Sequence, residues 1–516
     1  MWDLGDRNRC VTSAHTATAA DGGRSSLITF CSIPECSILL FVFWYIISII
    51  HMIGKRVDRR GGAVNIIYSI NDKINSIVWG PYMIFLLVGV GIFLTVRLKG
   101  IQFTKFRYII KNTVGKAFSS SEGEGAISSA KAGLTSIAAV VGTGNIAGVA
   151  TAIAIGGPGA VFWMWVSAIF GMATKFSEIT LGLHFREKEE GGTYAGGAMY
   201  YIEKGLHSKF LAGFFAVMVI IAYFVVGAIV DTNSICLSVH AQFGIPPLAT
   251  GVVFAVLTAV VILGGITRIG DVCQWLTPFM CGIYVFAGLA IIIINIKSVP
   301  GAFAEIFRGA FTPAGATGGF VGTTFMLMIT KGMARGLFSN EAGLGSSPII
   351  HSSAMVKHPV EQGIWGATEV FVDTIIVASI TGLSIVISGA WKTGLDGAPL
   401  TMKAFETALP GKIGSYIVML SAILFGYSCL ISANYYCEKA ANYLFGKHST
   451  IPIRITWCIF IIIGSLGGLK FVWDLADTCN GLMAIPNLIA LLILSPIVVK
   501  LTKEYFRQIK DSKEHI

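Results

Sequence analysis

The stretch that decides the fold is Ala130–Ala150, which reads AKAGLTSIAAVVGTGNIAGVA. It is apolar enough for a membrane, yet Gly142-Thr143-Gly144-Asn145 falls in its middle. Two glycines inside a helix cost about 1 kcal/mol each relative to alanine, and backbone groups freed in hydrocarbon must find other partners. The pattern predicts a helix interrupted halfway, whose freed peptide groups line a polar cavity. Close packing of helices through small residues is the alternative explanation.

The composition of the whole chain is typical of a helical membrane protein. Of its 516 residues, 54% are hydrophobic and 13% are charged, and the mean hydropathy is +0.73. Soluble domains carry about 25% charged residues, so a disordered chain, a coiled coil and an ordinary soluble enzyme are excluded. The net charge of +10 does not require a nucleic-acid partner, because Lys and Arg gather on the cytoplasmic side of membrane proteins. The expected environment is the lipid bilayer, with no nucleic acid.

Eleven apolar runs are long enough to cross a membrane, which takes about 20 residues. They are residues 76–96, 130–156, 159–184, 210–240, 247–266, 275–297, 319–350, 363–391, 412–434, 453–469 and 475–499. The basic stretch 97–116 is cytoplasmic by the positive-inside rule, which places the C-terminus in the cytoplasm as well. We therefore expect an all-α, multi-pass protein of the plasma or inner membrane with about 11 transmembrane helices.

The seventh run, 319–350, shows the same interruption as the second. It is apolar from Phe325, then carries Lys331 and Arg335 among glycines, and ends in polar residues that include Glu341. A charge in the bilayer centre costs at least about 2.5 kcal/mol. Two broken helices in matching positions of two five-helix halves predict a secondary transporter with an inverted repeat. The sequence contains no metalloprotease, serine hydrolase or channel-filter motif, so we do not expect an enzyme or a channel.

Longer motifs resemble the alanine or glycine:cation symporter family. They are VGTGNIAGVATAI from Val141, GGPGAVFWMWVSA from Gly156, GMATKFSE from Gly171, GAMYYIEKGL from Gly197, ARGLFSNEAGLGS from Ala334 and VWDLADT from Val472. The resemblance runs from about Ile74 to Tyr505. It implies a leucine-transporter-type fold, in which one extra helix precedes two inverted repeats of five helices. It also implies sodium-driven uptake of a small neutral amino acid of the alanine or glycine class, with glutamine taken by some members.

The resemblance divides the chain into five parts. Residues 1–70 are an atypical N-terminal extension, either signal-like or spurious, and 71–129 hold the extra helix and a basic cytoplasmic linker. Residues 130–297 and 298–499 are the two repeats, and 500–516 are a basic cytoplasmic tail. We expect a monomer with no cofactor besides sodium as the coupling ion.

The resemblance also implies the positions of the substrate and the ion. The substrate carboxylate would meet freed amides at Thr143 and Gly144, as at a helix N-terminus. Its side chain would face Phe325, Met328 and Ile329, which share one helix face; ordinary core packing is the alternative for these three. Sodium prefers oxygen ligands, here the carbonyls of three residues and one hydroxyl. These ligands are Ala138, Val141, Phe425 and Ser428.

Three positions depart from the family pattern. Cys429 and Ala433 replace the usual threonine and tryptophan, and Asp231 replaces a glutamine. The missing indole predicts a roomier pocket, which makes glutamine or another larger amino acid a candidate substrate. Asp231 is a functional candidate because carboxylates are costly inside membranes. It could pair with Lys331 or Arg335, bind the substrate, or take up a proton, in which case the protein would be a proton-coupled carrier.

Four other charged residues receive simpler interpretations. Lys175 and Glu178 are three residues apart near a helix end, which predicts a local pair or side chains that reach the interface. Glu369 and Asp373 are four residues apart in the eighth run and share a helix face. We expect these two carboxylates to balance Arg335.

Overall fold

The computed structural model describes residues 62–119, 122–189, 193–311, 325–467 and 470–514. Within these residues almost every element is a helix, and the strands are four pieces of two residues each. β1 (Ile127–Ser128) pairs in parallel with β4 (Ala354–Met355), and β2 (Glu187–Lys188) pairs antiparallel with β3 (Tyr194–Ala195). Most of the predicted N-terminal extension, residues 1–61, lies outside the described part.

Eight helices in the described part of the chain are long and apolar enough to cross a membrane, and a bent pair makes nine. The eight are Ser69–Arg97, Gly159–His184, Lys209–Phe243, Gly265–Ile294, Pro359–Ser388, Ile413–Phe445, Lys447–Ser465 and Leu475–Ser512. The bent pair is Ser129–Val140 with Thr143–Gly156. Each overlaps one of the predicted apolar runs, so the protein is a multi-pass helical membrane protein.

The predicted count of eleven spans is not confirmed. The fifth predicted run forms a helix of 16 residues, Pro247–Ile262, which is short for a span. The seventh is described only from Phe325 onward, again as a helix of 16 residues. Short helices such as α4 (Ile101–Thr104) and α14 (Val299–Phe311) also occupy regions between the spans.

The helices have the following bounds. They are α2 (Gly62–Val78), α3 (Pro81–Arg97), α4 (Ile101–Thr104), α5 (Phe106–Asn112), η1 (Val114–Lys116), α6 (Ser129–Val140), η2 (Thr143–Asn145), α7 (Ala147–Gly156), α8 (Gly159–His184), α9 (Ala198–Leu206), α10 (Lys209–Tyr223), η3 (Phe224–Val230), α11 (Asp231–Phe243), α12 (Pro247–Ile262), α13 (Gly265–Ile294), α14 (Val299–Phe311), α15 (Phe325–Asn340), α16 (Pro348–His351), α17 (Pro359–Val370), η5 (Phe371–Ala378), α18 (Ser379–Ser388), η6 (Ala390–Thr393), α19 (Gly397–Ala408), α20 (Ile413–Phe445), η7 (Lys447–Ser449), α21 (Thr450–Ser465) and α22 (Lys470–Glu514).

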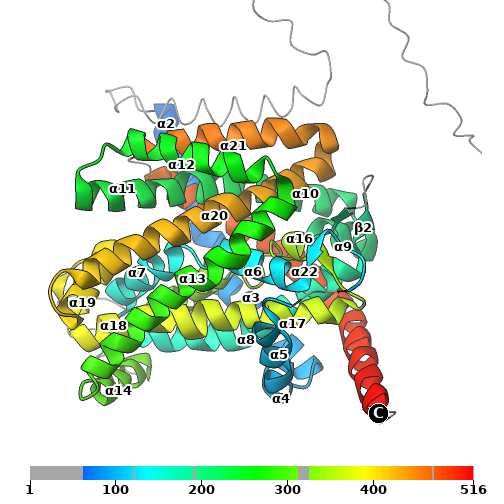
Figure 1. Cartoon of the computed structure of the whole chain (residues 1–516), viewed down its shortest axis with the longest axis horizontal. Coiled ribbons are helices and arrows are strands. Elements are labelled where there is room, and N and C mark those ends of the chain that lie inside the picture. Colours follow the sequence, from blue (N-terminus) through cyan, green and yellow to red (C-terminus); the bar gives the residue numbers. More distant parts are fainter. Residues whose placement is uncertain (1–61, 120–121, 190–192, 312–324, 468–469, 515–516) are drawn as a thin grey trace, which may run out of the picture. The chain divides into compact units, whose positions relative to one another are not determined.

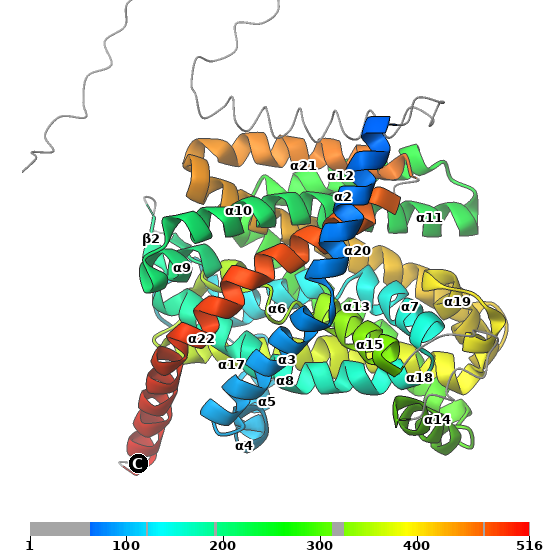
Figure 2. The same ribbon diagram turned by 180° about the vertical axis from the view of Figure 1, so that it is seen from behind.

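The broken helix α6–α7 is surrounded by helices from both predicted halves of the chain. α13, α17 and α20 pack against α6, while α15 and α19 pack against α7. Figure 1 shows α8 and α17 running side by side, and Figure 2 shows α15 beside α8 from behind. The interruption predicted at residues 142–145 therefore lies inside the helical body.

Gly332 and Gly336 do not break the helix of the seventh run, which corrects their place in the prediction: the described part of the run is interrupted only after Asn340, where a turn with positive φ angles at Gly343 and Gly345 leads into α16. α15 continues through Gly332 and Gly336 as far as Asn340. A Cβ atom at Gly332 would lie 2.6 Å from the Ala160 carbonyl oxygen, and one at Gly336 would lie 2.4 Å from the Ser167 hydroxyl. These two glycines allow α15 to pack closely on α8, which is the small-residue packing found between membrane helices.

Two spans contain π-helical segments, which often mark functional sites. η3 (Phe224–Val230) ends directly before Asp231, the first residue of α11. η5 (Phe371–Ala378) contains Asp373. Each π-helical segment therefore carries or presents a carboxylate that is buried in the helical body.

Candidate functional site

The first broken helix opens at the predicted place. Ser128 caps α6 by accepting a hydrogen bond from the Lys131 amide, and the helix ends at Val140. Gly142 is extended (φ −127°, ψ −162°), and η2 then leads into α7. The two helical parts meet at a bend of 55°. The predicted interruption of this span is confirmed.

A side chain within the break holds its backbone. Asn145 is fully buried, and its Oδ1 accepts a hydrogen bond from the Gly142 amide at 3.0 Å. Its Nδ2 donates to the backbone oxygen of Asp373 at 3.1 Å and to its Oδ1 at 2.7 Å. A freed peptide group in hydrocarbon needs such a partner. Asn145 thus fixes the shape of the break and ties it to η5.

The predicted carboxylate position borders open space. A Cβ atom added to Gly144 or to Gly148 would meet no atom within 4 Å. Beside it, the Thr143 hydroxyl donates a hydrogen bond of 2.7 Å to Oδ1 of Asp231. Both of these side chains are buried, at 6% and 5% exposed. The structure therefore brings together Thr143, Gly144 and Asp231, three of the residues that the resemblance or the burial of charge made substrate-site candidates.

Asp231 has no ion-pair partner among the described residues. Arg335, one of its two expected partners, lies 3.8 Å from Asp477 of α22 instead. The side chain of the other, Lys331, lies outside the described part. The contact with Thr143 leaves the second carboxylate oxygen of Asp231 available to a solute or a proton.

Three of the four predicted sodium ligands converge beside the break. The Ser428 hydroxyl of α20 lies 2.9 Å from the Ala138 carbonyl oxygen and 2.8 Å from the Phe425 carbonyl oxygen. Val141, the fourth, directly follows the last residue of α6, and it is buried. The thiol of Cys429 lies 3.3 Å from the Ala139 carbonyl oxygen. This cluster of oxygens suits a hard cation.

The residues expected around the substrate side chain are only partly described. Ile329 is half-buried on α15, which packs beside η2 and α7. The side chains of Phe325 and Met328 lie outside the described part. Ala433 is 2% exposed and packs against Gly227, where the ring of Trp457 also lies. The space expected from the missing indole is therefore filled on this side, which argues against the roomier pocket.

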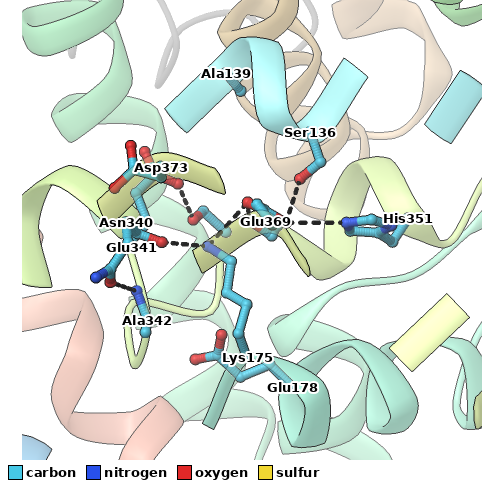
Figure 3. A network of polar contacts seen from close by, with 12 residues as sticks. Ser136, Ala139, Lys175, Glu178, Asn340, Glu341, Ala342, His351, Glu369 and Asp373 are labelled. Carbon is cyan, nitrogen blue, oxygen red and sulfur yellow. Dashed lines mark hydrogen bonds and ion pairs between the residues drawn. The ribbon is translucent and has the colours of Figure 1, made fainter. Parts of the chain in front are cut away.

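A second polar cluster lies where α8, α15 and α17 meet (Figure 3). Lys175 is fully buried; its Nζ donates to the Asn340 carbonyl oxygen at 2.9 Å and lies 3.2 Å from Oε1 of Glu369. Glu369 also accepts hydrogen bonds from Ser136 of α6 at 3.1 Å and from Ser347 at 2.8 Å. Glu369 therefore connects the broken helix to the chain that follows α15.

The turn after α15 is built around Glu178 of α8. Oε1 of Glu178 accepts hydrogen bonds from the amides of Gly343 and Gly345, at 3.0 and 3.2 Å. Both glycines have positive φ angles, as does Glu341 between helix and turn. The Asn487 side chain of α22 donates to the same oxygen at 2.5 Å. The turn and α22 are thus held by one buried carboxylate.

Two interpretations of charged residues prove wrong. Lys175 and Glu178 do not pair with each other or reach the interface; both are fully buried and bind other elements. Glu369 pairs with Lys175 and Asp373 binds Asn145, so neither balances Arg335. These roles could not be predicted from the strongly apolar sequence of the eighth span. The signal that could have revealed them is the pair of carboxylates at i and i+4 in a strongly apolar run.

Negative charge exceeds positive charge around the break. Five carboxylates here are at most 9% exposed: Glu178, Asp231, Glu341, Glu369 and Asp373. Among the described residues, two buried basic groups lie within 4 Å of these carboxylates. They are Lys175 and His351, and both contact Glu369. Buried carboxylates favour a bound cation or proton.

The multi-pass helical body and a span opened around buried polar groups define a membrane transport protein of the broken-helix class. The model of the sodium:alanine symporter family matches residues 64–516. A sodium/alanine symporter of Methanococcus maripaludis is 45% identical over 85% of this chain and 97% of its own length. The chain belongs to the sodium:alanine symporter family, so it is a carrier and not an enzyme.

Two further relatives, both from Bacillus subtilis, bear on specificity. A probable sodium/glutamine symporter is 36% identical and matches 86% of this chain and 91% of its own length. A putative sodium/proton-dependent alanine carrier is 34% identical and matches 86% of this chain and 93% of its own length.

Proposed function

We propose that this protein couples the inward flow of sodium to the uptake of a small neutral amino acid, and that both solutes bind at the break between α6 and α7. The observation that carries this proposal is the opening of that span beside two sets of polar groups, one suited to an amino acid and the other to a sodium ion. Open space adjoins Gly144, with Asp231 nearby, and carbonyl oxygens converge on the Ser428 hydroxyl. Amide groups, a carboxylate and neutral oxygens are the partners that a zwitterion and a sodium ion need.

In this proposal each group has a defined role. The amides at Thr143 and Gly144 bind the substrate carboxylate, and Asp231 binds its ammonium group. Sodium is held by the carbonyl oxygens of Ala138, Val141 and Phe425 with the hydroxyl of Ser428. The substrate side chain lies toward α15, at Phe325, Met328 and Ile329. Packing at Cys429 and Ala433 closes the other side.

The substrate is of the alanine or glycine class. Ala433 is packed against Gly227, so the α20 side of the site offers little additional volume. Glutamine is the competing substrate, because one relative is named as a probable sodium/glutamine symporter. Competition of unlabelled glycine, alanine and glutamine against labelled alanine separates the two: glutamine as the strongest competitor would overturn the assignment to the small class.

Proton coupling through Asp231 is the second candidate. It is favoured by the burial of this carboxylate without an ion pair in the described part of the chain. The name of one relative, a putative sodium/proton-dependent alanine carrier, also favours this mechanism. Under this mechanism Asp231 would carry a proton in one half of the cycle.

Uptake into proteoliposomes with separately imposed gradients tests both candidates. We expect labelled alanine to accumulate with an inward sodium gradient and not with a proton gradient alone. Accumulation driven by protons without sodium, and lost in Asp231→Asn, would favour proton coupling. If Asp231→Asn retained transport and its pH profile, a coupling role for this residue would be excluded.

The remaining features of the proposal concern the arrangement in the membrane. We propose residues 130–297 and 298–499 as two inverted repeats in a leucine-transporter-type fold, after the extra helix within 71–129. The protein would act as a monomer in the plasma or inner membrane, with residues 500–516 in the cytoplasm. The basic residues that follow α3 support this orientation.

A further inference from the structure

A basic cavity lies at one end of α3, apart from the transport site. It has a volume of 340 Å³ and lies between the α3–α4 connection and the last part of α22. Figure 2 shows α3 and α22 from the side on which both are in view, and the two helices contact each other. Because α3 ends a membrane span at Arg97, the cavity lies where that span leaves the hydrocarbon.

The charged lining of this cavity is entirely positive. Four of its lining residues are cations, Arg97, Lys99, Lys105 and Lys503, and none is a carboxylate. None of the four forms an ion pair within the described residues. The nearest acidic residue in sequence, Glu504, lies 3.9 Å from Lys500. Four cations without carboxylate partners repel one another, so an anion bound among them would be stabilised.

The cavity also offers hydroxyl and apolar groups. Thr104 and Thr502 line it, and so do Ile101 and Phe506. Lys105 lies over the Phe506 ring, with Nζ 4.8 Å from the ring centroid, which leaves ammonium hydrogens free for an anion. Phosphate oxygens accept hydrogen bonds from Arg, Lys and hydroxyl groups together.

An exposed apolar face of α3 leads up to the cavity. Tyr82, Phe85, Ile92 and Val96 are exposed, from 42% to 85%, and their spacing places them along one side of the helix. Phe103, beside the cavity, is 62% exposed. In a membrane-spanning helix these side chains contact acyl chains. A free anion would use the cations but not this apolar face.

We propose that the cavity binds the headgroup phosphate of an anionic phospholipid, whose acyl chains lie along the exposed face of α3. Arg97, Lys99, Lys105 and Lys503 hold the phosphate, and the threonine hydroxyls add hydrogen bonds. Basic cavities between membrane helices bind anionic headgroups elsewhere. Such a lipid would connect the extra helix to α22. The inference rests on the membrane spans and not on the proposed substrate or coupling ion.

Lipid binding to the purified full-length protein tests this proposal. Native mass spectrometry in detergent would measure bound phosphatidylglycerol, with phosphatidylcholine as the zwitterionic reference and inorganic phosphate as competitor. The site variant combines Lys99→Gln, Lys105→Gln and Lys503→Gln. Each cation near an anionic surface contributes on the order of a fivefold change in binding. We expect this variant to bind phosphatidylglycerol about a hundredfold more weakly.

A matched control removes three cations of the same basic stretch that do not line the cavity: Arg107→Gln, Lys111→Gln and Lys116→Gln. We expect it to bind phosphatidylglycerol within threefold of the unmodified protein, and both variants to keep the thermal unfolding midpoint in lipid-free detergent. Equal losses in the two variants would overturn the proposal, as would unchanged binding in the site variant. Complete displacement by inorganic phosphate at millimolar concentration would show a general phosphate site and overturn the lipid assignment.

Discussion

The break between α6 and α7 and the glycine-rich part of α15 share one sequence pattern and have opposite structures. Both place paired glycines in an apolar run. At Gly332 the α8 backbone occupies the place of a side chain, whereas at Gly144 that place is open. At the α6–α7 break the Asn145 side chain also accepts a hydrogen bond from the freed Gly142 amide. Glycines in a membrane helix thus indicate an opening only where a nearby side chain replaces the lost helical hydrogen bonds.

The two regions also differ in how their buried charges are paired. Lys175 and Glu369 join α8, α17 and the turn after α15 in a fully buried pair. Within the described residues, the carboxylate of Asp231, beside the break, is hydrogen-bonded only by the Thr143 hydroxyl. We therefore interpret the α8–α15–α17 contact as the rigid part of the protein and the α6–α7 break as the part that exchanges partners with solutes.

Removal of the buried lysine should give the largest effect on stability. In Lys175→Met the Glu369 carboxylate would remain buried without its lysine partner and keep only the contact with His351 and the hydroxyl hydrogen bonds among the described residues. Removal of one partner from a buried ion pair costs about 3–5 kcal/mol. We expect a large fall in the thermal unfolding midpoint in detergent, with partial recovery when Glu369→Gln is added. Lys204→Met is the control, because its pair with Glu187 is exposed and worth about 1 kcal/mol or less. Similar midpoints for the two single variants would contradict a rigid core here.

Overpacking of α15 on α8 should have the next largest effect. In Gly332→Ala the new methyl group would lie 2.6 Å from the Ala160 carbonyl oxygen. Overpacking of this kind costs about 1–3 kcal/mol. We expect a lower thermal unfolding midpoint. At temperatures where the protein is folded, alanine uptake per folded molecule should equal that of the unmodified protein. An unchanged midpoint would mean that the two helices are further apart than described.

Replacement of a glycine by alanine in the α6–α7 break should instead reduce uptake and leave stability nearly unchanged. In Gly144→Ala the methyl group meets no atom within 4 Å, so we expect the unfolding free energy to change by less than about 1 kcal/mol, the helix-propensity difference. Alanine uptake should fall at least tenfold, because the methyl group occupies the space next to the proposed carboxylate position. Normal uptake would place the substrate elsewhere.

Asn145 joins the two regions, and its loss should affect both. Asn145→Ala leaves the Gly142 amide without its side-chain partner, which costs about 1–3 kcal/mol for a buried group. It also removes one hydrogen bond from the Asp373 carboxylate, which keeps those from Ser339 and Thr374. We expect reduced alanine uptake together with a moderately lower unfolding midpoint. Asn295→Ala is the control, since Asn295 also bonds two carbonyl oxygens, Ile291 and Ala408, but away from the break. A larger loss of uptake in the control would contradict the role given to Asn145.

The sequence predicted the features that depend on local chemistry. Apolar length located the spans, and two glycines followed by Asn145 located the break. The family resemblance also placed Ala138 on the first broken helix and Ser428 on the helix opposite, and the structure brings these two residues within hydrogen-bond distance. Long-range packing could not be predicted in this way. Whether Gly332 opens a helix or packs on Ala160 depends on what lies opposite, which no local pattern contains.

The partners of the buried charges were missed for the same reason. Lys175 and Glu178 are neighbours on one helix, so a local pair was the simplest interpretation. Their actual partners, Glu369 and the amide of Gly343, are far away in the sequence. The packing of Trp457 beside Gly227, which fills the space near Ala433, likewise involves a separate helix.

The central claim is that sodium and the amino acid bind together at the break, and the sodium dependence of alanine binding to the purified protein tests it most directly. When two solutes stabilise the same closed state, each raises the other's affinity by the same factor. We expect alanine affinity to rise with sodium in the unmodified protein and in Ser432→Ala, which removes a hydroxyl one turn away on α20. In Ser428→Ala this dependence should shift to at least tenfold higher sodium. The same sodium dependence in Ser428→Ala and Ser432→Ala would contradict the account.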